Sequence, residues 1–173
     1  MANTQDLTEA LVAYIEENQA RFYRWAYRYV HNETAALDVV HDSIVEALTH
    51  IRELRHPDSM RSWFYHILIH ESLRAVRHRQ RLLPLETLPE KASREQPDAG
   101  RAVDVLRAVD NLPPRLRVVV MLRFYEDMTL EEIAVATDAN LSTIKSRLYK
   151  AMGLLRAALR DYAEEELTHE TVE

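Results

Sequence analysis

The chain has 173 residues, with two glycines, no cysteine and a formal net charge of −6. So few glycines argue against a turn-rich β fold, and the helix formers Ala, Leu, Glu and Arg are frequent, so we expect an all-α protein. The composition excludes disulfides, and neither a signal peptide nor an apolar run of the ~18 residues that span a membrane is recognisable. We therefore expect a cytoplasmic protein that does not insert into the membrane.

The acidic charge is concentrated at the end of the chain. The last 13 residues hold six Asp or Glu and no Lys or Arg, and without them 22 acidic residues face 22 basic ones. Two stretches, residues 72–81 and 141–160, carry only basic charge. Because the distribution of charge governs nucleic-acid binding better than its total, both stretches are candidate nucleic-acid segments.

Apolar residues at helical spacing predict three helices in the first half of the chain, at about 8–30, 33–52 and 60–81. Asn32 is a candidate N-cap of the second helix. The predicted core stripe of that helix consists of Leu37, Val40, Ile44, Ala47, Leu48 and Ile51.

Residues 83–100 contain three prolines and one glycine and show little periodicity, which predicts a flexible linker. Further helices are predicted at about 101–111, 114–126, 130–137 and 141–162. The predicted architecture is two small helical domains, 1–82 and 101–163, joined by the linker 83–100 and followed by an acidic tail, 164–173.

The second domain contains the plan of a helix-turn-helix, a short helix and a longer basic helix joined by a tight turn. Thr129 and Glu132 match the capping box that begins a helix, and Asp138 can adopt the left-handed conformation of the turn. The side chains expected to pack inward are Ile133, Ala134, Leu141, Ile144 and Leu148. The opposite face offers hydroxyls and cations for phosphates and base edges, although a solvated helix of an ordinary bundle remains the alternative.

The sequence NLPPRLRVVVMLRFYEDMTLEEIA at 111–134, continued by TIKSRLYKA at 143–151, resembles the last conserved region of bacterial sigma factors. The family is the sigma-70 family, and the group is the extracytoplasmic-function group. The resemblance implies a helix-turn-helix that binds the minus-thirty-five promoter element as duplex DNA. The implied contacts are Ser142, Thr143, Lys145, Ser146, Arg147 and Lys150. Asp138 stands where the family often has Gly.

The stretch DVVHDSIVEA at 38–47 resembles the helix of this family that docks on the clamp helices of RNA polymerase. The implied polymerase contacts are Asp38, Val39, His41, Asp42 and Glu46. The family usually has Gln where His41 stands, and a solvated acidic face is the alternative interpretation.

The stretch SWFYHI at 62–67, with the basic residues up to 81, resembles the region that melts and holds the minus-ten element. Aromatic faces and cations capture unstacked bases, although Trp63 and Phe64 are expected in the helix core, and the loop 55–61 is the implied base-capturing loop. The implied contacts are Asp58, Ser59, Met60, Arg61, Tyr65, His66, His70, Arg74, Arg77, His78 and Arg81. His70 and Arg74 depart from the family, which commonly has Asn and Asp there.

His66 and His70 lie four residues apart and could share a metal ion on one helix face. No third ligand can be assigned, so polar surface histidines are the favoured interpretation, and neither a metal nor another cofactor is expected. No phosphate-binding loop or nucleophile motif is recognisable, so an enzyme or a metal-binding bundle is the weakest alternative.

The resemblance implies a sigma factor, which binds core RNA polymerase at the beta-prime clamp helices and the beta flap and directs promoter-specific initiation. It implies two further partners: promoter DNA, both duplex and melted, and an anti-sigma factor that can hold the protein at the membrane. A stand-alone repressor or activator, usually a dimer on paired half-sites, is the other alternative. It leaves the aromatic and basic third helix unexplained.

Overall fold

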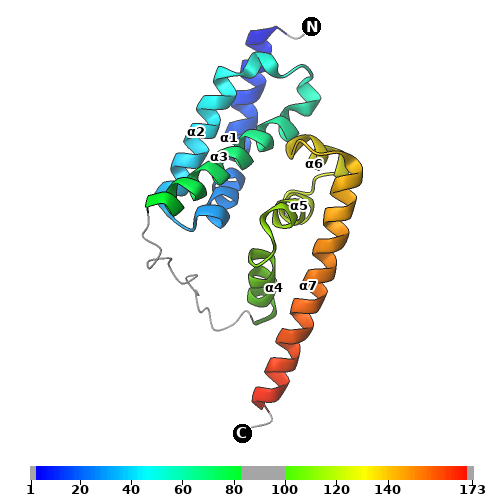
Figure 1. Cartoon of the computed structure of the whole chain (residues 1–173). Coiled ribbons are helices and arrows are strands. Elements are labelled where there is room, and N and C mark those ends of the chain that lie inside the picture. Colours follow the sequence, from blue (N-terminus) through cyan, green and yellow to red (C-terminus); the bar gives the residue numbers. More distant parts are fainter. Residues whose placement is uncertain (1–2, 83–99, 171–173) are drawn as a thin grey trace. The chain divides into compact units, whose positions relative to one another are not determined.

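The computed structural model describes residues 3–82 and 100–170, which form helices and no strand. The chain divides into two compact units, whose helices are labelled in Figure 1. The first unit holds α1 (Thr4–Val30), α2 (Glu33–Thr49) and α3 (Met60–Leu82). The second holds α4 (Gly100–Asp110), α5 (Pro114–Phe124), α6 (Leu130–Ala136) through Ala134, and α7 (Leu141–Glu170). The predicted all-α class is confirmed.

Most helix boundaries agree closely with the prediction, but α1 begins at Thr4 instead of near 8, and α2 ends at Thr49 instead of near 52. α7 continues to Glu170 instead of ending near 162, and Gly100 begins α4 instead of ending the linker. The rest of the predicted linker, residues 83–99, lies outside the described residues.

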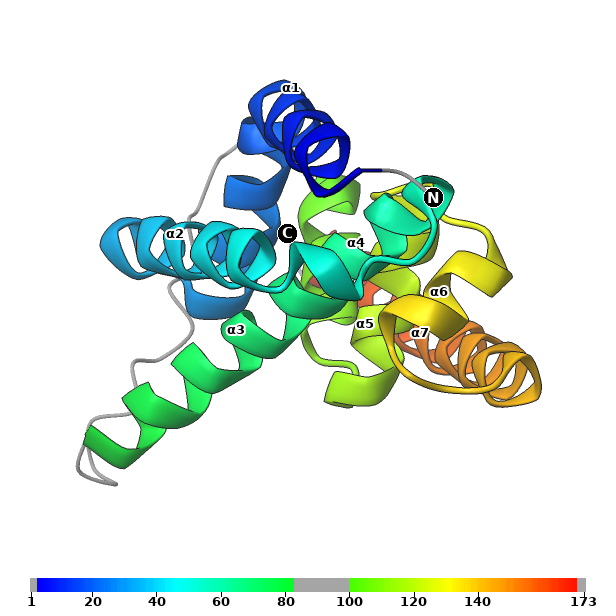
Figure 2. The ribbon, with the colours of Figure 1, turned by 90° about the horizontal axis from the view of Figure 1, so that it is seen from above.

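In the first unit each of the three helices packs against the other two, and Figure 2 shows α2 and α3 from above. Their core is aromatic: the ring centroids of Phe22 and Phe64 lie 4.5 Å apart, and those of Trp25 and Tyr65 lie 5.5 Å apart. Phe64 is completely buried, as expected, whereas Trp63 is half-buried. The large rings of α1 and α3 therefore fill the space between these two helices.

The buried face of α2 consists of small and medium side chains, which corrects the predicted stripe. Ala36, Val39, Ser43 and Ala47 are buried, whereas Leu37 is 59% exposed and Leu48 is also exposed. Ser43 Oγ donates to Val39 O at 2.7 Å, so its buried hydroxyl is satisfied within the helix. Small residues let α2 approach the ring-filled core closely, and Leu37, Val45 and Leu48 face outward.

In the second unit α7 packs against α4 and α5. Val119, Leu122, Ile133 and Ile144 are fully buried. An ion pair joins α4 to α5, with Arg117 Nη2 3.2 Å from Asp110 Oδ1 and both side chains largely buried. This core holds α7 against α4 and α5.

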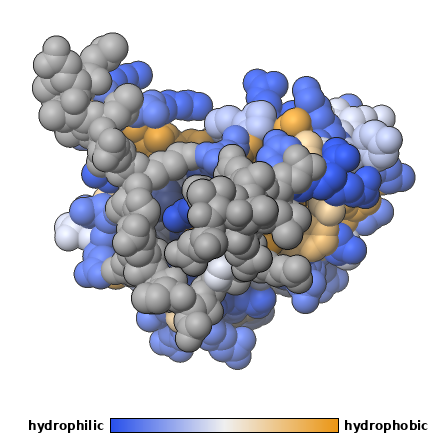
Figure 3. All heavy atoms as spheres, turned by 90° about the horizontal axis from the view of Figure 1, so that it is seen from below, coloured by the Kyte–Doolittle hydropathy of each residue, from blue (hydrophilic) through white to orange (hydrophobic). Residues whose placement is uncertain are grey.

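The described surface is mostly hydrophilic on the face that Figure 3 presents, with smaller hydrophobic areas between the charged ones. None of the helices within the described residues is long and apolar enough to cross a membrane.

Candidate nucleic-acid interface

Side chains fix both ends of the turn segments around α6. Thr129 N–H donates to Glu132 Oε2 at 2.8 Å, and Glu132 N–H donates back to Thr129 Oγ1 at 3.1 Å, so the predicted capping box is confirmed. Asn140 caps α7 by accepting from Thr143 N–H at 2.8 Å. Asp138 takes a φ of 49°, in the left-handed region that short polar side chains tolerate. The turn that aims α7 is therefore determined by residues within and beside it.

Two apolar side chains anchor this motif, Ile133 on α6 and Ile144 on α7, both completely buried. The three other residues expected to face inward, Ala134, Leu141 and Leu148, are half-buried. Among the six minus-thirty-five candidates, Ser142, Lys145, Ser146 and Lys150 are exposed, and Thr143 and Arg147 are half-buried. Tyr149 lies beside them and is 84% exposed, so its side chain does not contribute to the core. The first turns of α7 therefore present a polar, basic surface.

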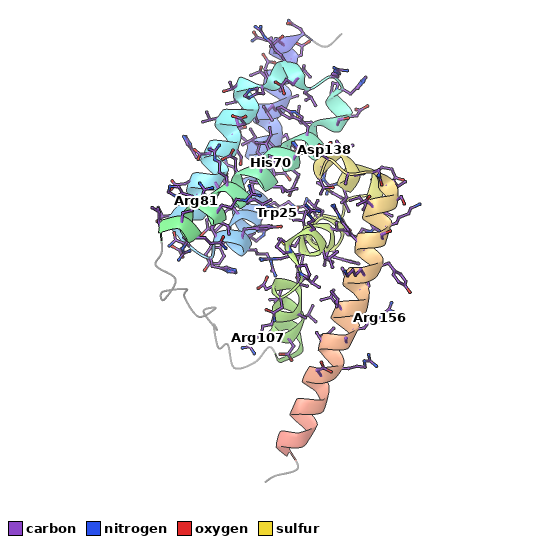
Figure 4. All side chains as sticks on the ribbon, in the orientation of Figure 1. Trp25, His70, Arg81, Arg107, Asp138 and Arg156 are labelled. Carbon is purple, nitrogen blue, oxygen red and sulfur yellow. The ribbon has the colours of Figure 1, made fainter. Side chains whose placement is uncertain are left out.

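The basic end of α3 contains arginines with different partners. Arg74 Nη2 lies 3.1 Å from Glu71 Oε2, and Arg79 Nη1 donates to Val30 O, the last carbonyl of α1, at 2.8 Å. Arg77, His78 and Arg81 are exposed along the same helix, and Figure 4 shows Arg81 at its end. Arg79 thus stabilises the junction of two helices, because cations suit a helix C-terminus.

Two of the minus-ten candidates are buried, which corrects their prediction as DNA contacts. Tyr65 is 1% exposed and packs edge-on against Trp25, and Met60 is buried where α3 begins. Their side chains are core residues of the first unit and do not reach its surface.

The predicted base-capturing loop is short and anchored at both ends. Leu54 and Met60 are buried, and the 3-10 turn Pro57–Ser59 lies between them. Asp58 and Ser59 are exposed on this turn, and Arg61 follows as a half-buried residue of α3. The loop therefore presents polar side chains on a fixed base.

His66 and His70 come close together on α3, with ring centroids 4.5 Å apart. Desolvation and the positive charges of His66 and Arg77 lower the pKa of His70, which sits in the middle of α3 (Figure 4). Within the described residues, no three His, Asp or Glu side chains are grouped so that they could hold a metal ion.

α2 presents two adjacent stripes to solvent. The predicted polymerase contacts Asp38, His41, Asp42 and Glu46 are exposed, and Glu46 Oε1 lies 3.3 Å from His50 Nδ1. Val39 is buried and faces the core, so its prediction as a contact is corrected. The second stripe is apolar and consists of the exposed Leu37, Val45 and Leu48.

Sequence reasoning missed two features of this face. Leu37 and Leu48 were predicted as core but are exposed, and the exposed Val45 beside them was not singled out, whereas the prediction of Ala47 as core is confirmed. Glu71 of α3 was missed as well, although it is buried beside Arg74. Burial raises the pKa of the Glu71 carboxyl, with Arg74 opposing the rise and Asp42 and Glu46 adding to it.

Two family models match the chain. The one described as Sigma-70 region 2 matches residues 14–82, and the one described as Sigma-70, region 4 matches residues 102–155. The first match begins within α1 and ends with α3, and the second runs from α4 to the middle of α7.

Similar proteins cover most of the chain. It is 38% identical over 161 residues to RNA polymerase sigma factor SigV of Bacillus subtilis (strain 168), spanning 92% of this chain and 96% of that protein. It is 30% identical over 158 residues to ECF RNA polymerase sigma factor SigE of Mycolicibacterium smegmatis, spanning 86% of this chain and 59% of that protein.

Two solved structures resemble the chain in fold. CnrH in complex with the cytosolic domain of CnrY has a TM-score of 0.65 at 20% identity, covering 91% of this chain and 95% of that one. The sigma factor RpoE in complex with the anti-sigma factor NepR, from Bartonella quintana, has a TM-score of 0.61 at 21% identity, covering 90% and 95%.

Proposed function

The chain belongs to the sigma-70 family of RNA polymerase sigma factors, in its extracytoplasmic-function group, and from that membership we propose which of its surfaces bind which partners. It acts in transcription initiation, and we propose that it carries no catalysis of its own. The proposed units of function are residues 1–82 for polymerase and the minus-ten element, 101–163 for the minus-thirty-five element, the linker 83–100 and the acidic tail 164–173.

Core RNA polymerase binds the exposed face of α2, where Asp38, His41, Asp42 and Glu46 lie beside the apolar stripe. Leu37, Val45 and Leu48 are apolar side chains that the chain itself leaves in water. A protein partner would bury them and pair the neighbouring carboxylates, the combination of apolar centre and polar rim found in protein interfaces. The clamp helices of the beta-prime subunit are the proposed partner, with the beta flap as the partner of the second unit.

The minus-ten element binds the first unit as melted DNA. The proposed contacts are Asp58, Ser59, Arg61, His66, His70, Arg74, Arg77, His78 and Arg81, without the buried Met60 and Tyr65. The polar loop offers donors and acceptors to an unpaired base, and the arginines follow the backbone.

The minus-thirty-five element binds the first turns of α7 as duplex DNA. The proposed contacts are Ser142, Thr143, Lys145, Ser146, Arg147 and Lys150. A helix of this diameter fits the major groove, in which its N-terminal side chains reach base edges and phosphates.

An anti-sigma factor is the proposed regulator, as the complex of RpoE with NepR illustrates for a protein of the same fold. The regulator would hold the protein inactive in the cytoplasm or at the membrane by covering the faces that polymerase and DNA require. The alternative, a stand-alone duplex-binding regulator, gives no role to the apolar stripe of α2.

The observation that carries the proposal is the occurrence of both family regions, in order, along one chain. The test is run-off transcription with purified core polymerase, this protein, and the DNA upstream of its own gene. We expect a transcript from one defined start site that core polymerase alone does not make. Absence of any specific transcript, together with a tight gel shift by the free protein, would favour the stand-alone regulator.

Lys145→Gln sharpens this test because it removes one exposed cation from the proposed DNA surface. If Lys145 neutralises a phosphate, the slope of log affinity against log salt for promoter duplex falls by about 0.9. Arg156→Gln, an exposed residue three turns further along α7 (Figure 4), is the matched control and should leave the slope unchanged. Equal slopes for both variants would contradict the proposed position of the duplex.

A further inference from the structure

One face of α1 takes no part in the surfaces described so far. Between Glu17 and Glu33 the chain has three arginines and no acidic residue. The rings of Tyr23 and Tyr27 are stacked, with centroids 6.1 Å apart and planes at 29°, and the ring of His31 follows 6.4 Å from Tyr27. These three rings and Arg24 repeat at helical spacing along one side, and together they form the α1 ladder.

The α1 ladder lies on the solvent side of its helix. Arg24 and His31 are exposed, and Tyr23 and Tyr27 are half-buried. Phe22, Trp25, Ala26, Tyr29 and Val30 are buried on the opposite side. The fully buried side chains of α1 thus lie outside the ladder, whose two tyrosines are only partly covered by the rest of the unit.

The end of the ladder adjoins the basic end of α3. Arg79 reaches from α3 to Val30 O, one residue before His31. Arg77 and Arg81 are exposed on the same part of α3. Arg79 therefore brings one positive charge from α3 to the carbonyl that precedes the end of the ladder.

We propose that the α1 ladder binds unpaired nucleotides of the melted promoter strand, an inference that rests on the proposed function. Bases stack on aromatic faces without regard to sequence, and nearby arginines attract the phosphates. Tyr23 and His31 are eight residues apart, about 12 Å along the helix axis, which matches about three stacked nucleotides. Tyrosine and arginine are also enriched at protein interfaces, so binding of a protein partner at this face is a contrary outcome of the tests below.

The test measures the binding of a fluorescent oligothymidine by the holoenzyme, with core polymerase alone as the baseline. In the double variant Tyr23→Leu, Tyr27→Leu, packing area is kept and aromatic faces are lost, so we expect the affinity to fall about tenfold or more. In the double variant Tyr23→Phe, Tyr27→Phe, the rings remain, and we expect wild-type affinity. The same affinity in the leucine and phenylalanine variants would overturn the proposal, because stacking would then have no part in binding.

Arg24→Gln gives a second test that does not depend on folding, because Arg24 is exposed. Loss of one phosphate contact to a single strand lowers the salt slope by about 0.7. Arg107→Gln on α4, another exposed arginine (Figure 4), is the control and should not change it. An unchanged slope in Arg24→Gln, or weaker assembly of its holoenzyme with core polymerase, would overturn the proposal.

These outcomes are distinguishable from failure of the proposed function. If the wild-type holoenzyme gives no promoter-specific transcript, the proposed function fails whatever the oligothymidine affinities are. If it does give that transcript and the leucine variant melts the promoter and binds the oligonucleotide normally, only the inference about the α1 ladder fails.

Discussion

Helices α2 and α7 carry surfaces of opposite construction. α2 turns small side chains such as Ala36 and Ala47 to its own core and leaves Leu37 and Val45 in water. α7 buries its large Ile144 and presents hydroxyls and cations. The exposed apolar side chains of α2 are available to bind another protein. The exposed side chains in the first turns of α7 are mostly polar or basic. The difference indicates a protein partner for α2 and a polyanion for α7.

The largest effect is expected at the core of the helix-turn-helix. Ile144→Ala removes a completely buried side chain and leaves a cavity, so the free energy of unfolding should fall by about 2–5 kcal/mol. Urea unfolding followed by circular dichroism measures it. Leu154→Ala, at an exposed position of the same helix, is the control and should cost much less. Equal losses would mean that α7 is not anchored through Ile144.

Substitution of Leu37 on α2 should affect binding of core polymerase rather than stability, because Leu37 is exposed. Leu37→Ser should change the free energy of unfolding by no more than about 0.5 kcal/mol and weaken binding of core polymerase about tenfold. Val12→Ser, at an exposed apolar position on α1, is the matched control. If both variants bind core polymerase like the wild type, the apolar stripe is not the docking surface.

The sequence predicted those parts of the fold that depend on near neighbours. The capping box of Thr129 and Glu132 and the left-handed Asp138 lie within a few residues of the bonds that they determine, and they were found. Which face of α2 is buried depends on its packing against α1 and α3, so the size of its apolar residues did not predict that face correctly. Tyr65 was likewise not predicted as a core residue, because its burial also depends on other helices. The end of α7 was placed too early because acidic charge suggested a tail, although Glu, Ala and Leu also favour a helix.

A smaller effect, and a gain, is expected at Gly153 of α7. A Cβ built there would have no heavy atom within 4 Å, so the glycine has no steric reason to be in a helix. Gly153→Ala should raise the free energy of unfolding by about 0.5–1 kcal/mol, because alanine loses less backbone entropy on folding. Thermal unfolding tests this, and a lower melting temperature would contradict it.

The smallest expected effect is on how the free energy of unfolding depends on pH. At the acidic α2–α3 junction Glu71 is buried near Asp42 and Glu46. Among the described side chains of α7, no carboxylate is buried beside other carboxylates. Burial raises the pKa of Glu71 above its ordinary value of 4.5, so the folded chain holds a proton there that the unfolded chain has already released. The unfolded state then binds fewer protons, and the stability contributed by this group falls as pH rises from about 4.5 through the raised pKa. Glu71→Gln removes that loss, so the variant should gain stability relative to wild type as pH rises through this window and differ little below it.

Arg74→Gln is the control with the opposite sign. Without Arg74 Nη2 at 3.1 Å, the pKa of Glu71 should rise further, and the loss of stability with rising pH should be larger than in the wild type. Parallel stability curves for wild type and Glu71→Gln between acidic and neutral pH would mean that the carboxyl of Glu71 is solvated, and that the junction between α2 and α3 carries its acidic face without a penalty.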